Sequence, residues 1–444
     1  MFKNIFPLAL VSSLRFLGLF IVLPVISLYA DSFHASNPLL IGLAVGGAYL
    51  TQILFQTPIG ILSDKIGRKV VVIICLLVFL AGSLICFQAS DITTLVIGRL
   101  IQGMGALGGV VSAMVADLVR EEERTKAMAF MGAFIFMSFT ISMAIGPGVV
   151  AFFGDAKWLF LLTAILALLS LLTLLRVKET PKITYKIKTQ KNQTPNSKAL
   201  YLLHLSSFFE KMFMTLIFVL IPLALVNEFN KHESFLIWVY VPGALFGILS
   251  MGPASIIAEK YNRPKGVMLS GVLFFILSYL CLFLADSSFL GKHLWLFIIG
   301  VMLFFTGFAT LEPIMQSLAS KFARANEKGK VLGQFTTYGY LGSFVGGIMG
   351  GLSYHHLGIA NTSLIVVALG IMWLLLLFLS LHNPAMQKNV YFPLDAYNED
   401  KFETIEDKII EWYVNVAEEI IIVKYNSNQI SEEEIIHLAQ DFRK

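Results

Sequence analysis

Two glutamates lie inside long apolar stretches of this chain, where a carboxyl group could bind and release a proton. Glu312 lies in the stretch FATLEPIM, and Glu210 lies in SSFFEKMF. A charged side chain at the centre of a bilayer costs about 2.5–3.5 kcal/mol on insertion scales, so such residues mark functional sites or have buried partners. We take Glu312, next to the helix-kinking Pro313, as the first candidate proton or substrate residue and Glu210 as the second. The alternative for Glu312 is a structural glutamate held by a buried partner.

Three more ionisable residues in apolar stretches are candidates for the same proton or substrate site: Arg15, Arg99 and His204. The alternatives are that Arg15 extends to the membrane surface and that Arg99 is an interfacial arginine. His204 lies almost two helical turns before Lys211 and shares its face. The alternative interpretation of His204 is a polar contact between helices.

The sequence offers little for an enzyme or a cofactor. A membrane protease would need a Ser/His set, paired aspartates or a zinc motif, and we find no convincing set at membrane depth. Its three cysteines lie in apolar runs and are typical of core residues. The chain has no GxxxxGK[ST] loop, so direct ATP-driven work is not expected. We therefore expect no catalytic residues, metal, cofactor or nucleic-acid partner.

Most of the chain is apolar enough to lie in a membrane. Of its 444 residues, 57% are hydrophobic and 14% are charged, whereas soluble domains carry about 25% charged residues. A helix needs roughly 20 apolar residues to cross a bilayer. We predict an all-α membrane protein with twelve transmembrane helices, at 6–30, 39–62, 70–89, 92–118, 127–153, 158–176, 199–226, 235–257, 266–285, 293–319, 331–354 and 361–382.

A repeat divides these spans into two groups of six. The pattern Pro-x5-Asp-x3-Arg begins at Pro58, after the second span, and recurs from Pro253, after the eighth, with Glu in place of Asp. Parallel six-helix repeats are one plan of secondary transporters. The basic, polar stretch between the groups is the expected linker. We thus predict two six-helix bundles, at 1–177 and 199–386, which a linker at 178–198 connects. A soluble domain is expected at 387–444.

The last residues resemble a small soluble domain. From 389 to 444 there are 13 acidic and 5 basic residues. Residues 390–394 and 419–425 have strand patterns, and a capping box that begins at Ser431 predicts a final helix. The order β-α-β-α predicts an α+β domain, and the alternative is a poorly ordered tail. The helix between the two strands is predicted from an apolar stripe, namely Phe402, Ile405, Ile409, Trp412 and Val416.

Several motifs resemble the major facilitator superfamily. The ten residues GILSDKIGRK closely match its motif between helices 2 and 3, and the weaker match GP in span five resembles the motif of its drug:proton antiporter branch. The stretch RLIQGMG, which begins at Arg99, resembles a further motif. Span one and the segment after span four resemble a bacterial member with a C-terminal ferredoxin-like domain, here one strand short. The matching residues are Gly60, Asp64, Gly67, Arg68, Lys69, Asp117, Gly146 and Pro147.

The resemblance implies roles for these residues. Asp64 and Arg68, with Asp117, are expected to form a clasp that holds the outward-facing state. Gly60 is expected to permit close helix approach and Gly67 a tight turn. In the family, the motif position of Arg99 is linked to proton coupling.

We therefore expect a major facilitator fold and a proton-coupled exporter that exchanges drugs or other small molecules for protons by alternating access. The alternatives are an exporter of sugars or metabolites, and a transporter-like sensor that signals through the C-terminal domain. The expected partners are a small-molecule substrate, protons, the lipid bilayer of a bacterial inner membrane, and a cytoplasmic partner or ligand for the C-terminal domain.

Topology gives the first prediction. The segments after even-numbered spans contain twenty Lys and Arg residues, and those after odd-numbered spans contain three. Because basic loops stay in the cytoplasm, we expect both termini there. A cysteine at Asn37 should react with a membrane-impermeant maleimide in whole cells, and a cysteine at Asn192 should not. The opposite labelling pattern would overturn this orientation.

Overall fold

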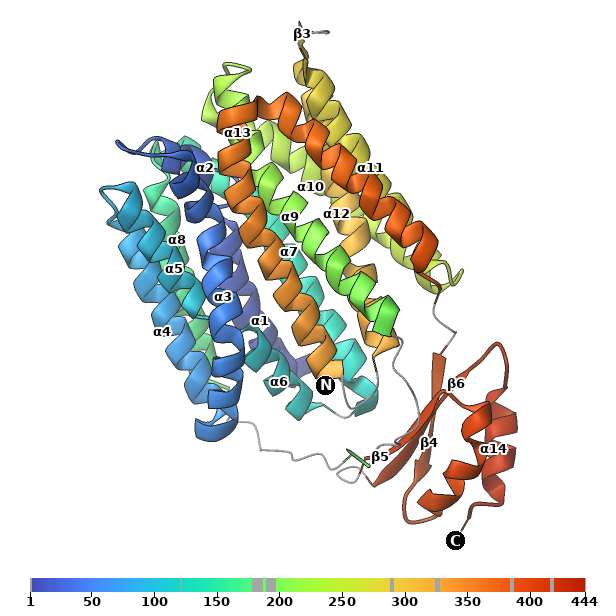
Figure 1. Cartoon of the computed structure of the whole chain (residues 1–444). Coiled ribbons are helices and arrows are strands. Elements are labelled where there is room, and N and C mark those ends of the chain that lie inside the picture. The colour runs from blue at the N-terminus through green and yellow to red at the C-terminus, as the bar shows by residue number, and fades with distance from the viewer. Residues whose placement is uncertain are drawn as a thin grey trace.

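The computed structural model describes residues 2–119, 121–177, 187–188, 197–287, 291–323, 328–383, 387–415 and 419–443. Long helices form its main body, and a small sheet lies beyond one end of them (Figure 1). We call the end of the bundle nearer this sheet the sheet end, and the opposite one the far end. The helices of the first half are α1 (Phe2–Phe20), α2 (Ile26–Asp31), α3 (Pro38–Ile66), α4 (Arg68–Phe87), α5 (Ile92–Met104), α6 (Gly108–Leu118), α7 (Glu121–Phe153) and α8 (Lys157–Leu175).

Ten helical stretches within the described ranges are long and apolar enough to cross a membrane. The apolar part of α1, Ile5–Phe20, is shorter. Two expected spans are merged in α13, which is interrupted at Gly358 with a φ of 72°. The chain is thus a multi-pass membrane protein, and the number twelve stays a prediction. The helices of the second half are α9 (Ser197–Asn227), α10 (Leu236–Glu259), α11 (Pro264–Ala285), α12 (Leu294–Phe322) and α13 (Lys328–Ser380).

Glycines close the far end between the two halves. Helix α3 packs backbone to backbone on α13, so that a Cβ at Gly42 would lie 2.7 Å from the carbonyl oxygen of Gly347. Deeper in the bundle, the ring of Phe139 on α7 lies 5.0 Å from that of Phe308 on α12. Close packing of small residues is the usual way in which helices associate in lipid. The halves are therefore in tight contact at this end.

The same two helices diverge toward the sheet end (Figure 1). A Cβ at Gly60 of α3 or at Gly333 of α13 would meet nothing within 4 Å. The close helix approach expected at Gly60 is therefore not found in this conformation, because no helix lies against it there.

The C-terminal residues form a sheet, and most of the elements expected there are present. The order of its strands is β1-β5-β6-β4, with every neighbouring pair antiparallel. Both expected strands are found as β4 (Gln387–Pro393) and β6 (Ile420–Asn426). The last helix, α14 (Glu432–Gln440), begins after Ser431, whose hydroxyl accepts a hydrogen bond from the Glu434 amide at 3.2 Å.

The helix expected between these strands is partly wrong. A 3-10 helix, η3, covers Glu399–Lys408, and the chain then becomes strand β5 (Glu411–Asn415). Trp412 and Val414 point into the core with the two-residue period of a strand. Trp412 faces the same core as Phe402 whether this segment is a helix or a strand. The helical spacing of the apolar residues was therefore misleading. Val416 lies outside the described residues.

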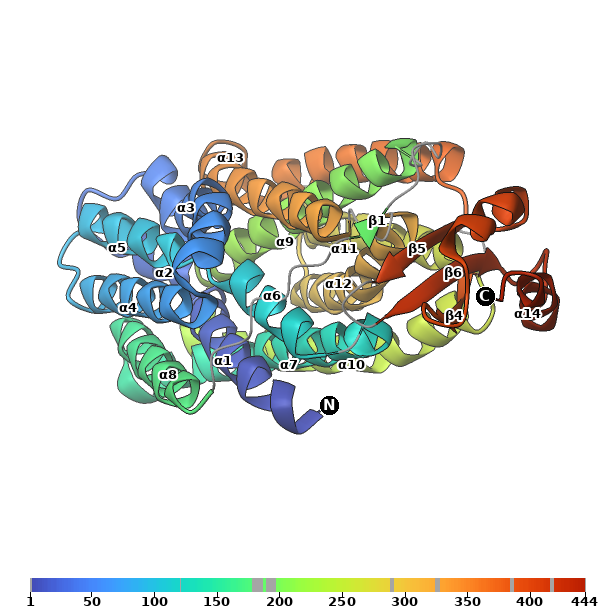
Figure 2. The ribbon, with the colours of Figure 1, turned by 90° about the horizontal axis from the view of Figure 1, so that it is seen from below.

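An additional strand comes from the linker. Residues Ile187–Lys188 form β1, which pairs with β5 so that Ile187 faces Asn415. The linker is basic and the C-terminal residues are acidic, so charge favours the same pairing. Figures 1 and 2 place the sheet below the helices of the second half. Apart from β1 and the residues from 197 onward, the expected linker lies outside the described residues, and the domain boundaries stay predictions.

Pairing of β1 with β5 predicts a specific cross-link. In a chain whose three native cysteines are replaced by alanine, Ile187→Cys with Asn415→Cys should form a disulfide on mild oxidation, because these residues face each other in the sheet. A protease site inserted at 288–290 then releases two fragments that stay joined on a non-reducing gel. The control pair, Ile187→Cys with Asn428→Cys, should not cross-link. Equal yields from the two pairs would contradict the strand pairing.

Candidate functional site

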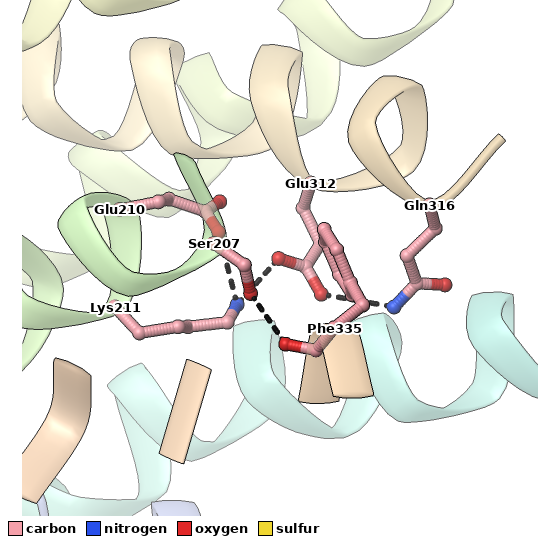
Figure 3. Close-up of polar contacts among 6 residues, drawn as sticks. All are labelled: Ser207, Glu210, Lys211, Glu312, Gln316 and Phe335. Carbon is pink, nitrogen blue, oxygen red and sulfur yellow. Dashed lines mark hydrogen bonds and ion pairs between the residues drawn. The ribbon is translucent and has the colours of Figure 1, made fainter. Parts of the chain in front are cut away.

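A lysine inside the bundle is shared by two glutamates. Lys211 on α9 forms an ion pair with Glu312 on α12, and its Nζ also lies 3.5 Å from an Oε of Glu210 (Figure 3). The side chain of Gln316, one turn after Glu312, donates a hydrogen bond to the other Glu312 oxygen at 3.2 Å. The structure therefore brings both candidate glutamates together and gives Glu312 a lysine partner within the bundle.

The neighbours Glu210 and Lys211 differ in solvent exposure because adjacent residues of a helix point about 100° apart. Glu210 is fully buried, and neither of its carboxylate oxygens has a hydrogen-bond partner among the described residues. The side chains of Lys211 and Glu312 are 20% and 22% exposed. The Nζ of Lys211 also lies 4.6 Å from the ring centroid of Phe308, a cation–π distance. Solvent thus reaches Glu312 but not Glu210.

The charges of this cluster do not balance without a proton. One ammonium group faces two carboxylates, so the cluster carries one negative charge when both glutamates are ionised. Binding of a single proton makes it neutral.

Arg15 lies elsewhere in the bundle and does not extend to the surface. It is 1% exposed, and its Nη2 donates to the carbonyl oxygen of Gly105 at 3.3 Å. Its guanidinium lies 4.9 Å from the ring of Phe16 and 5.3 Å from that of Phe79. The alternative of a surface-seeking arginine is therefore wrong.

Arg99 and His204 make structural contacts. Arg99 is fully buried, and its guanidinium bonds the backbone oxygens of Ala44 and Val45 and the side chain of Gln102. It joins α5 to α3 and is not interfacial. His204 contacts the carbonyl oxygen of Val331 on α13 at 3.3 Å, which matches its alternative of a contact between helices.

The clasp residues meet at the turn between α3 and α4. The Nε of Arg68 lies 2.8 Å from Asp117, whose side chain is 6% exposed, and its Nη2 lies 3.8 Å from the 69% exposed Asp64. Gly67, with a φ of 107°, makes the turn between the two helices. All these residues belong to the first half, and here the far end is closed. The expected role of the clasp in an outward-facing state stays a prediction.

Two lysines at repeat-related positions bind helix ends. Lys69 donates to the carbonyl oxygen of Leu175 at 3.2 Å and to that of Val177 at 2.5 Å, at the end of α8. In the second half, Lys265 donates to the carbonyl oxygen of Phe378 at 2.7 Å, near the end of α13. Cations at helix C-termini satisfy free carbonyl groups. This equivalence supports the internal repeat and gives Lys69 a structural role.

The antiporter-type motif lies at a close helix contact. A Cβ at Gly146 of α7 would clash with the carbonyl oxygen of Ile21, in the turn that joins α1 to α2. Pro147 follows inside the same helix. The motif therefore permits α7 to approach the first helical segments at the far end.

Sequence reasoning missed the bridging role of Lys211 and the nearby tyrosines Tyr49 and Tyr340. A lysine beside Glu210 was a signal, but the sequence did not show that Glu312, 101 residues away, is its partner. The tyrosine rings contact each other across the two halves, with centroids 6.1 Å apart and ring planes tilted by 32°. Nothing in their local sequence distinguishes them from core aromatic residues.

Known proteins resemble this chain over most of its length. A model of the Major Facilitator Superfamily matches residues 8–209 and 203–398. The inner membrane transport protein YajR of Escherichia coli (strain K12) is 36% identical over 78% of this chain and 76% of YajR. The tetracycline resistance protein, class H, of Pasteurella multocida is 26% identical, over 80% of this chain and 90% of that protein. A D-xylose-proton symporter structure superposes with a TM-score of 0.71 at 16% identity, over 86% of this chain and 98% of that one.

The unequal burial of the clasp aspartates predicts unequal effects on stability. Asp117→Asn should lower the free energy of unfolding by about 1.5–3 kcal/mol, because it removes the charge of a buried carboxylate that forms an ion pair with Arg68. Asp64→Asn, the matched control, should cost below about 1 kcal/mol, as expected for an exposed pair. Unfolding of the purified protein in mixed micelles measures both. Equal losses from the two substitutions would contradict this assignment.

Proposed function

Because the chain belongs to the major facilitator superfamily, we propose that it is a proton-coupled exporter of small molecules that works by alternating access. Its family and its relatives are transporters and not enzymes. The observation that carries the proposal is the single Lys211 ammonium shared by Glu210 and Glu312.

This cluster can exchange one proton with the solvent. Glu312 is partly exposed and receives the proton first, whereas Glu210 is buried and holds Lys211 from the other side. When Glu312 is protonated, its attraction for Lys211 falls, and the ammonium shifts toward Glu210. Because α9 and α12 carry these groups, the exchange changes how tightly the two helices are held together. Protonation from outside would then favour substrate release, and substrate binding from inside would favour proton loss.

The arrangement of the two halves supports alternating access. They pack closely at the far end through the glycines of α3 and α13 and diverge toward the sheet end. By the distribution of basic residues, the sheet end is cytoplasmic. The conformation then corresponds to an inward-facing state, in which Glu312 and Lys211 are accessible from the cytoplasm.

Export is favoured by the relatives. They include the tetracycline resistance protein, class H, the multidrug resistance protein 1 of Bacillus subtilis and quinolone resistance proteins of Staphylococcus aureus. Resistance through a membrane transporter is most simply achieved by removal of the compound from the cell. We therefore assign outward transport of amphipathic small molecules in exchange for protons.

The C-terminal sheet has a regulatory role in this proposal. Its strand β1 comes from the segment that joins the halves, so a cytoplasmic partner or ligand bound to the sheet acts on the linker. Transport itself would survive removal of 387–444 at least in part.

Glu312→Gln should abolish transport driven by a pH gradient. A proton that crosses a potential equivalent to 100 mV supplies about 2.3 kcal/mol, enough for more than a tenfold substrate gradient. Inverted vesicles that contain the wild-type chain should accumulate tetracycline or a fluorescent quinolone when their interior is acidic. With Glu312→Gln, accumulation should fall to the level seen without a gradient. Counterflow exchange, which needs no net proton movement, should be partly retained.

Glu403→Gln provides the matched control, since Glu403 is exposed on η3, away from the helical bundle. It should respond to the gradient as the wild type does. An unchanged response of Glu312→Gln would exclude Glu312 as the carrier and would make Glu210 the residue to test. Failure of the wild type to accumulate either compound under any gradient would set aside drug export.

A further inference from the structure

Arg15 is a buried cation without an acid. No carboxylate of the described residues lies within ion-pair distance of it, and its Nε has no hydrogen-bond partner there. Arg99, equally buried, bonds three groups through its guanidinium. A buried charge is costly unless it is paired and hydrogen-bonded, and of these two arginines only Arg15 has a single hydrogen bond, so Arg15 requires an explanation.

Other unpartnered polar groups lie on α3, whose Tyr49 is within electrostatic range of Arg15. Tyr49 on α3 is 3% exposed and Gln52 is 0% exposed, and neither the tyrosine hydroxyl nor either amide atom of Gln52 has a hydrogen-bond partner among the described residues. Because they are three residues apart, the two side chains share a face of α3. Gln56, one turn further along this face, also has an unpartnered amide oxygen. Native proteins leave few such groups unsatisfied.

Tyr340 connects this region to the proton-binding cluster. Its ring packs against that of Tyr49, with the two ring planes tilted by 32°, and it lies within electrostatic range of Arg15, Lys211 and Glu312. Arg15 and Tyr49 belong to the first half, and Tyr340 belongs to the second. A ligand held between them would touch both halves.

We propose that this region is the binding site for the carboxylate of an organic anion, with Arg15 as its cation and Tyr49 and Gln52 as further hydrogen-bond donors. A guanidinium matches a carboxylate in shape and charge. Aromatic side chains, including Phe16, Phe20 and Phe344, pack around the two tyrosines, so an apolar body attached to the carboxylate has a surface to contact. The inference rests on the proposed transport function and names its substrate class.

The test compares three ligands with the same apolar body. The full-length protein in lipid nanodiscs is titrated with 4-phenylbutyrate, its neutral amide and 4-phenylbutylamine, and the dissociation constants are measured. We expect the acid to bind about tenfold or more tightly than the amide and the amine, as a charge-assisted contact provides. Arg15→Gln should remove this preference and leave binding of the amide unchanged. The surface control Lys157→Gln should keep it.

Two further variants keep the test decisive if Arg15→Gln does not fold. Tyr49→Phe and Gln52→Leu remove groups that have no protein partner, so neither should lower the unfolding temperature of the ligand-free protein. Both should weaken binding of the acid several-fold. Loss of stability without any change in binding would assign these groups to the fold and contradict the proposal.

The proposal would also be overturned if the wild type bound the acid and the amide equally well, or bound neither. It would likewise be overturned if Arg15→Gln left binding of the acid unchanged. These outcomes are separate from failure of the proposed function. A chain that moves a drug along a pH gradient without preferring the acid refutes only the anion site. A chain that prefers the acid but ignores the gradient refutes only proton coupling.

Discussion

Lys211 is a single ammonium between two carboxylates in the interior of the bundle, and much of the arrangement around it depends on that charge. Removing charges from water is costly unless they are paired. Glu210 has no hydrogen bond of its own among the described residues, so its ionised form depends on Lys211. Glu312 competes for the same ammonium from another helix. Under the proposed function, protonation of this cluster changes how α9 is held to α12, whereas contacts between apolar side chains do not respond to a proton.

The closed far end and the divergent sheet end follow from different contacts. Glycines let α3 and α13 approach at backbone distance at the far end, and this packing carries no charge that a proton could alter. Polar and charged groups lie deeper, at Lys211, Arg15 and Tyr340. Rigid halves that meet through small residues at one end can rock about a polar centre, as described for transporters built from repeats. Under the proposed function, proton exchange at the Lys211 cluster acts on this rocking motion, which the close packing at the glycines permits.

The sequence was sufficient for the helical architecture, the repeat and the elements at the C-terminus that have local signals. The capping box at Ser431 and the strand at 419–425 are determined by neighbours in the chain. The sequence could not indicate that the linker provides strand β1, because a two-residue strand has no pattern of its own. Nor could it assign Lys211 to Glu312, since their contact depends on how two distant helices pack. At the clasp, motif resemblance found the right residues but not their unequal burial.

Arg15 and Arg99 show why membrane depth alone does not identify a functional charge. Both are arginines in apolar spans, and both are buried. Arg99 is surrounded by backbone oxygens that α3 exposes toward it, together with Gln102, and these satisfy its guanidinium. Arg15 has one carbonyl group and two aromatic rings, which leave its charge without a counter-ion. A structural arginine carries its partners within the protein. An arginine whose partners are incomplete is suited to a ligand that supplies them and then leaves.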